Sequence, residues 1–167
     1  TSLPESIGNF KHIRILNLSN NHLTSFPKSI SKMQYLSELH LHDNKLRSLR
    51  KSIGQLINLR KLNVCNNKLT SFPESLGNFK HIRILNLSKN HLTSLPESIG
   101  KLINLKELHL HDNKLRSLPE SIGKLINLRE LNVYNNKLRS LPESIGNIKY
   151  IRILNLSKNH LTSLPES

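Results

Sequence analysis

A phrase of regularly spaced apolar residues returns every 23 residues along this chain of 167 residues, in seven in-register copies. The first copy contains Ile13, Leu16, Leu18, Asn21 and Leu23. The copies begin at residues 13, 36, 59, 82, 105, 128 and 151, and we number the positions of each unit from this first apolar residue. One unit is too short to bury its apolar side alone, so the repeat predicts a solenoid in which stacked units share a core.

Positions 3 to 7 of each unit alternate polar with apolar residues, which is the periodicity of a β-strand. Strands that lie one repeat apart in a solenoid must run parallel. We therefore expect short parallel strands near residues 15–18, 38–41, 61–64, 84–87, 107–110, 130–133 and 153–156. An asparagine such as Asn90 follows each strand at position 9. Because a buried amide is costly unless it is bonded, we expect this side chain to bond to the backbone of adjacent units.

The second half of each unit carries the prolines and glycines. All seven prolines lie at position 15 and all six glycines at position 19, where Arg50 and Ser31 are the departures. Proline removes an N–H donor and glycine permits a sharp turn. We therefore expect no strand in this half, and we expect apolar positions 14, 18 and 21 to close the core from this side.

The phrase LNLSKNHLTSLPESIGKLINL, which begins at position 4 of one unit and ends at position 1 of the next, resembles the leucine-rich-repeat family in its 23-residue LPxxIGxL class. The resemblance covers the whole chain. It implies an α/β solenoid, a horseshoe with a parallel sheet on the concave face and short turns or 3₁₀ segments on the convex face. Repeats of this class are similar to those of intracellular scaffolds and secreted bacterial effectors, which implies a protein-interaction module.

Residues 1–167 are predicted to form one leucine-rich-repeat domain, an uncapped fragment of a longer chain, because Thr1 comes first and the only methionine is Met33. A longer period of 69 residues shows that a block of three units was copied. Repeat arrays need terminal caps, and neither end departs from the consensus. We expect open apolar edges at both ends and possible end-to-end self-association. The residues of these edges are Leu3, Ile7 and Phe10 at one end and Leu156, Leu161 and Leu164 at the other.

The polar strand positions 3, 5, 7 and 8 vary between units while the core positions do not. We expect these side chains on the concave face, where they would bind a partner protein. The candidate partner-binding residues are Ile15, Glu38, His40, His42, Asp43, Ile84, Lys89, Glu107, His109, His111, Asp112, Glu130, Tyr134, Ile153 and Lys158.

The chain is strongly basic, with 25 Lys and Arg against 11 Asp and Glu and a net charge of +14. The basic residues form two rails beside the strands, at position 2, as in Arg83, and at positions 10 and 12, as in Lys114 and Arg116. This favours a protein partner with an acidic surface. One alternative partner is a polyanion, either nucleic acid or an anionic lipid surface. Another possibility is that the chain is a spacer arm, and a third is that the rails only keep the array soluble. Nucleic acid is not expected, because Tyr134 is the only aromatic residue predicted on the concave face.

His40 and His42 face the same side of one predicted strand, and Cys65 occupies the position of His42 one strand further. Two histidines and a cysteine can hold zinc. These residues are explained equally well as polar surface residues that were copied with the block of three units. We expect no metal and no cofactor. The sequence shows no phosphate loop or nucleophile elbow, and an open sheet provides no oxyanion hole. We therefore expect a protein that is not an enzyme.

The single cysteine, Cys65, cannot form an internal disulfide and favours a reducing compartment. We therefore expect an intracellular location, in the cytoplasm or, for an effector, in the cytoplasm of a host. No apolar run has the length of a membrane span. The sequons at Asn17, Asn86 and Asn155 recur with the repeat, and we interpret them as part of the repeat rather than as glycosylation sites.

Overall fold

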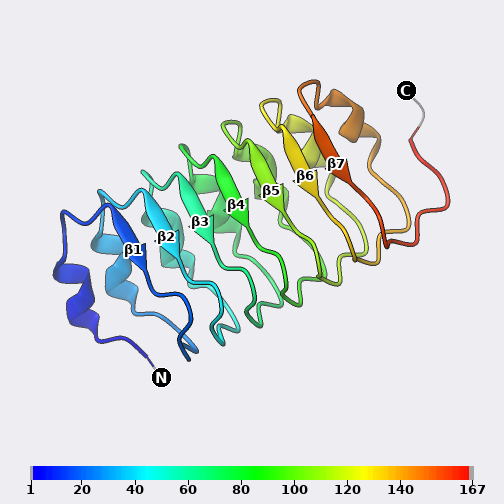
Figure 1. The fold of residues 1–167 in the computed structure, drawn as a ribbon. Coiled ribbons are helices and arrows are strands. Elements are labelled where there is room, and N and C mark those ends of the chain that lie inside the picture. The colour runs from blue at the N-terminus through cyan, green and yellow to red at the C-terminus, as the bar shows by residue number, and fades with distance from the viewer. Residues whose placement is uncertain (1, 166–167) are drawn as a thin grey trace.

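The fold, in a computed structural model that describes residues 2–165, is a solenoid with one strand per unit in a single parallel sheet (Figure 1). The strands are β1 (Ile15–Asn17), β2 (Glu38–His40), β3 (Lys61–Asn63), β4 (Ile84–Asn86), β5 (Glu107–His109), β6 (Glu130–Asn132) and β7 (Ile153–Asn155). They stand in sequence order, and each pairs with the next in a register of one unit, as Ile84 does with Glu107. The predicted parallel strands are confirmed, each one residue shorter at its carboxyl end.

A row of short 3₁₀ helices forms the second layer, behind the sheet (Figure 1). These helices are η1 (Glu5–Asn9), η2 (Lys28–Lys32), η3 (Lys51–Gln55), η4 (Glu74–Asn78), η5 (Glu97–Lys101), η6 (Glu120–Lys124) and η7 (Glu143–Asn147). Proline is the residue before all of them except η3, with a φ of −69° at Pro96, which is the value that its ring imposes. Arg50 precedes η3 with a φ of −67°. The predicted convex 3₁₀ segments are confirmed, and we call the open side of the sheet the concave face.

The core lies between these two layers. In the unit that begins at Ile82, the side chains of Leu85, Leu87, Leu92 and Ile99 are fully buried. Burying each such side chain stabilises the fold by about 1.5–3 kcal/mol. The same positions are buried in the other central units, so the core is one continuous strip.

The asparagine at position 9 forms the predicted ladder. The side-chain amide of Asn90 donates to the carbonyl oxygens of Val64 in the preceding unit, at 3.0 Å, and of Leu87 in its own unit, at 3.1 Å. Its Oδ1 accepts the N–H of Leu69 at 3.0 Å. The same bonds recur at Asn44, Asn67, Asn113, Asn136 and Asn159. The ladder therefore satisfies backbone groups that no strand pairs.

The glycines at position 19 have a different role from the sharp turns that we expected. No glycine of the described chain has a positive φ. Glycine is needed there because neighbouring 3₁₀ helices approach closely: a Cβ on Gly100 would lie 2.6 Å from the carbonyl oxygen of Ser121. The left-handed conformation occurs instead at position 8. The residues that adopt it are Asn20, Asp43, Asn66, Lys89, Asp112, Asn135 and Lys158.

The two ends of the described chain expose apolar side chains. Phe10 is 63% exposed, Leu154 is 43% exposed and Leu164 is 66% exposed. The other residues expected at these edges, Leu3, Ile7, Leu156 and Leu161, are partly buried against the core. The predicted exposure is thus concentrated in fewer residues than expected.

None of the described helices is long and apolar enough to cross a membrane.

Candidate binding face of the sheet

The strands position the candidate residues because successive side chains of a strand point to opposite faces. In β5, Leu108 is buried in the core, whereas Glu107 and His109 on either side of it are half-buried on the concave face. The same alternation holds in β2 to β6, so positions 3 and 5 form two parallel rows across the sheet. Positions 7 and 8 follow where each strand ends.

The structure divides the candidate residues into two groups and three separate isoleucines. One group lies on β2 and directly after it and comprises Glu38, His40, His42 and Asp43. The other lies over β5 to β7 and comprises Glu107, His109, His111, Asp112, Glu130, Tyr134 and Lys158. Lys89 lies beside the second group, close enough to act on the charge of Asp112. Ile15, Ile84 and Ile153 stand three strands apart, and Ile15 and Ile153 are exposed.

At positions 3 and 5 of the second group, the imidazole of His109 lies between two carboxylates. Nε2 of His109 lies 3.5 Å from Oε2 of Glu107, and Nδ1 lies 3.6 Å from Oε1 of Glu130. Glu107 and Glu130 are directly opposite each other in the β5–β6 register. In residues 2–165 these three form the only group of three or more His, Cys, Asp or Glu side chains that could hold a metal ion, and their ligand atoms all lie within 4.8 Å of one another.

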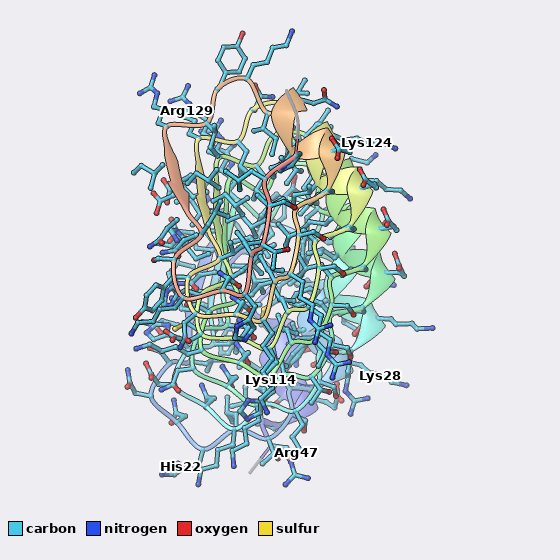
Figure 2. All side chains as sticks on the ribbon, turned by 90° about the vertical axis from the view of Figure 1, so that its right-hand side faces the viewer. His22, Lys28, Arg47, Lys114, Lys124 and Arg129 are labelled. Carbon is cyan, nitrogen blue, oxygen red and sulfur yellow. The ribbon has the colours of Figure 1, made fainter. Side chains whose placement is uncertain are left out.

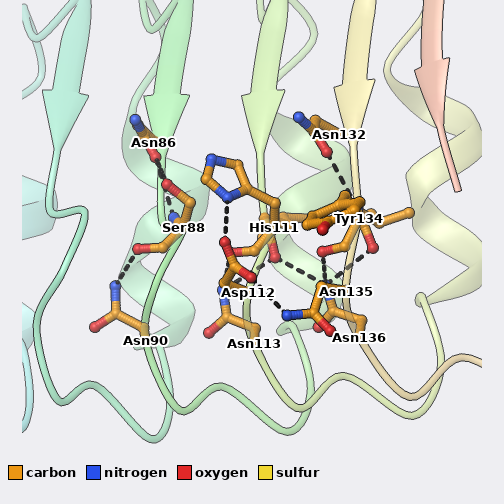
Figure 3. Close-up of polar contacts among 12 residues, drawn as sticks. Asn86, Ser88, Asn90, His111, Asp112, Asn113, Asn132, Tyr134, Asn135 and Asn136 are labelled. Carbon is orange, nitrogen blue, oxygen red and sulfur yellow. Dashed lines mark hydrogen bonds and ion pairs between the residues drawn. The ribbon is translucent and has the colours of Figure 1, made fainter. Parts of the chain in front are cut away.

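In the lower row, at positions 7 and 8, hydrogen bonds hold the carboxylate of Asp112 (Figure 3), and an ammonium group lies over the ring of Tyr134. Asp112 accepts a hydrogen bond from the amide of Asn135 at 2.6 Å and lies 2.9 Å from Nδ1 of His111. The pKa of the Asp112 carboxyl is lowered, chiefly by the Asn135 hydrogen bond and next by that of His111. The ammonium group of Lys158 lies 5.1 Å from the ring centre of Tyr134, and its interaction with the Tyr134 side chain raises the pKa of Lys158.

The first group shares part of this arrangement but not all of it. His40 pairs with Glu38 at 3.2 Å, and Nδ1 of His42 lies 3.2 Å from the side-chain amide of Asn63. The rings of His40 and His42 meet edge to face, with centroids 6.1 Å apart. In the part of the chain that the structure describes, these two histidines and Cys65 do not form a compact set of metal ligands. The ligand cluster lies in the second group, whose residues the sequence analysis names as partner-binding residues and not as metal ligands.

The asparagine at position 5 has a local role that the sequence reasoning missed. Oδ1 of Asn86 accepts the N–H of Ser88 at 3.0 Å and its hydroxyl at 2.5 Å (Figure 3). Asn17 and Asn155 make the same bonds to the serine two residues on. The N-x-S spacing is therefore a turn motif that ends the strand. His40 and His109 replace this asparagine and are thereby available on the face.

Basic side chains line both edges of the concave face. Arg129 stands at one edge and Arg47 and Lys114 at the opposite edge (Figure 2). A shallow groove of about 350 Å³ runs along the first edge, and a second of about 530 Å³ lies at the other. The first is lined by Arg60, His81, Arg83, Asn104, Lys106, Asn127 and Arg129, and the second by Arg116, Lys137, Arg139 and His160. Within residues 2–165, no Lys or Arg forms a salt bridge with a carboxylate.

The sequence matches two family models, "Leucine-rich repeat region" over residues 61–136 and "Leucine Rich Repeat" over residues 12–33 and 127–148. A solved leucine-rich-repeat protein of Leptospira interrogans superposes with a TM-score of 0.96 at 36% identity, over 99% of this chain and 42% of that one. The chain belongs to the leucine-rich-repeat family, whose members are typically binding modules and not enzymes.

Two further solved structures are similar, one of them of a plant peptide hormone receptor. The peptide hormone receptor RGFR1, solved in complex with RGF2, matches with a TM-score of 0.76 at 26% identity, over 95% of this chain and 30% of that one. The PEPR1–AtPEP1 structure matches with a TM-score of 0.76 at 29% identity, over 98% of this chain and 30% of that one. The chain spans less than half the length of these proteins. No curated protein matches it.

Proposed function

We propose that this chain is a protein-interaction module that binds a partner protein or peptide through its concave face. The observation that carries the proposal is the lower row over β5 to β7, where Asp112, Tyr134 and Lys158 are held by hydrogen bonds and a cation–π contact. Side chains that are fixed before binding lose less entropy when a partner docks. Tyrosine is also among the residues that contribute most to protein interfaces.

The charges of this face indicate the chemistry of the partner. Glu107, Asp112 and Glu130 lie in the middle of the face, whereas basic side chains line both edges. A complementary partner therefore carries a cationic group that meets the central acids and an acidic surface that meets the edges. Since members of this family include receptors solved with a peptide, a peptide is as suitable as a folded domain.

The test is affinity capture of partners with three forms of the chain, read by mass spectrometry. The first is the wild type, and the second reverses the charge of the concave acids through Glu107→Lys, Asp112→Lys and Glu130→Lys. The third is a matched control on the convex side, Glu97→Lys with Glu120→Lys, both exposed. We expect the wild type and the convex control to capture the same partner and the concave variant to lose it. Equal loss in both variants, or loss in the convex control alone, would contradict the proposal.

A second candidate function is polyanion binding along the basic edges, favoured by one observation. Arg60, Arg83, Lys106 and Arg129 share a groove and, within residues 2–165, have no carboxylate partner. Basic side chains on adjacent strands are about 4.8 Å apart, so a linear anion such as a nucleic acid or an anionic lipid surface can contact several.

Salt separates the two candidate functions. The affinity of binding that depends on phosphate contacts falls steeply as the salt concentration rises. Partly buried contacts on the concave face are screened less by salt. Capture that survives half-molar salt supports the protein partner. The polyanion is supported instead if the chain binds any anionic polymer and this binding disappears at half-molar salt. The double variant Arg83→Gln with Lys106→Gln should then abolish the binding.

We also infer an intracellular location and end-to-end association of this chain. The single cysteine supports a reducing compartment. The exposed side chains of Phe10, Leu154 and Leu164 support contacts between the ends of two molecules. Sizing across a concentration series tests the association: a mass that rises with concentration is expected, and a constant monomer mass contradicts it.

A further inference from the structure

A histidine lies between two glutamates at the centre of the concave face, and this cluster has the composition of a metal site. We propose that Glu107, His109 and Glu130 bind one divalent transition-metal ion of the Zn²⁺ class. The proposal is independent of the proposed function, because it requires no partner protein. Its basis is the geometry of the three side chains, the register of β5 and β6, and the contrast with the equivalent position of the first block.

The distances between the donor atoms suit a small divalent ion. Zn²⁺ binds nitrogen and carboxylate oxygen at about 2.0–2.2 Å in a tetrahedral arrangement, which places neighbouring donors about 3.3–3.6 Å apart. Nε2 of His109 and Oε2 of Glu107 are separated by 3.5 Å. One ligand atom from each of the three residues lies within 4.8 Å of the others. Glu107 is close to Nε2 of His109 and Glu130 is close to Nδ1, so a side-chain rotation must bring both carboxylates to the ion that one ring nitrogen binds.

The rigidity of the sheet keeps the two carboxylates close although they repel each other. Glu107 and Glu130 are directly opposite in the β5–β6 register, and like charges at such positions destabilise a sheet. The neighbours of this pair in the same row are Ile84 on β4 and Ile153 on β7, which supply no positive charge. A bound cation removes this repulsion.

The first block of the chain contains the same arrangement with one decisive difference. Glu38 and His40 occupy the positions of Glu107 and His109, but the residue opposite Glu38 on β3 is Lys61. Lys61 provides the positive charge that the second block lacks. The two blocks therefore form a natural comparison, in which one position carries either an ammonium group or a second carboxylate, which is the third ligand of the proposed site.

The ligand set selects the class of ion. Imidazole suits zinc, copper, iron and nickel, and zinc also binds carboxylate oxygen. Calcium needs 6–8 oxygen ligands, and this cluster offers one nitrogen and two carboxylates. Three protein ligands leave the remaining coordination position of a Zn²⁺ ion open to water or to another ligand.

The experiment is calorimetric titration of the whole chain with ZnCl₂ in a buffer without chelators, with thermal unfolding as a second readout. We expect the wild type to bind about one ion per chain and to unfold at a higher temperature when Zn²⁺ is present. Glu130→Lys copies the arrangement of the first block, so its fold is expected to persist, and its affinity for Zn²⁺ is expected to fall by more than about tenfold. His109→Asn, which introduces the residue most common at this position, should have the same effect.

The reciprocal variant is Lys61→Glu, which places a second glutamate beside Glu38 and His40. We expect it to raise the stoichiometry to about two ions per chain. Cys65→Ser tests the alternative ligands His40, His42 and Cys65, and it is expected to leave binding unchanged. The proposal is overturned if the wild type binds no Zn²⁺, if Glu130→Lys binds as tightly as the wild type, or if Cys65→Ser abolishes binding.

Discussion

Gly100 and Ser121 belong to neighbouring 3₁₀ helices, and a Cβ on Gly100 would lie 2.6 Å from the carbonyl oxygen of Ser121. We predict that Gly100→Ala lowers the free energy of unfolding by about 1–3 kcal/mol, because the added methyl group forces η5 and η6 apart. The matched control is Ser31→Ala. Position 19 already carries a Cβ in that unit, so a change of about 0.5 kcal/mol or less is expected. Urea unfolding measures both, and equal losses would refute this role of the glycine.

The asparagine ladder makes a second prediction, which compares a buried position with an exposed one. Asn90→Ala leaves the N–H of Leu69 and the carbonyl oxygen of Val64 without their partner, and is expected to cost about 1–3 kcal/mol. Asn17→Ala removes only the bonds to Ser19 at an exposed site, and should cost far less. Thermal unfolding of the two variants is the test, and equal shifts in melting temperature would contradict the assigned roles.

The left-handed backbone at position 8 predicts a stabilising substitution. Lys89 has a φ of 53°, a conformation that asparagine tolerates better than lysine. We expect Lys89→Asn to raise the free energy of unfolding by up to about 1 kcal/mol. Lys68→Asn is the control, since Lys68 is exposed and has no positive φ, and its effect should stay within about 0.5 kcal/mol. A loss of stability in Lys89→Asn would show that the backbone is not strained there.

The lowered pKa of Asp112 predicts a pH dependence. A carboxyl whose pKa is lowered by folding stabilises the protein at pH values above its unfolded-state pKa, near the ordinary value of 3.8, and the stabilisation is lost as the pH falls through the folded-state pKa. Asp112→Asn keeps a residue that suits the left-handed backbone. Unfolding measured as a function of pH should show the wild type more stable at neutral pH, with a difference that shrinks in acid. A difference that does not change with pH would rule out this contribution.

Much of the fold follows from the repeat because the evidence for it is local and periodic. The alternation around Leu108 and the recurrence of Asn90 predicted the strands and the ladder, which the structure confirms. The close approach of Gly100 to Ser121 was missed, because it depends on the spacing between units, which no single unit encodes. The left-handed positions did carry a signal, since Asn and Asp are frequent at position 8, but Lys89 and Lys158 obscure it.

The candidate site was predictable as a face but not as a set of contacts. The alternation of each strand placed Glu107 and His109 on the same side of the sheet. Side-chain rotamers then decide which groups meet: His42 turns toward Asn63, whereas His111, at the same position of the second block, turns toward Asp112. The sequence spacing is the same in both blocks, so spacing alone could not distinguish them.

The central claim is that the concave face makes the functional contact, and site-specific photo-crosslinking tests it most directly. A photoreactive amino acid is introduced at Tyr134 on the concave face or at Glu120, which is exposed on the convex side. Each form is then irradiated with the captured partner. We predict a crosslink from position 134 and none from position 120. A crosslink from position 120 without one from position 134 would contradict the account.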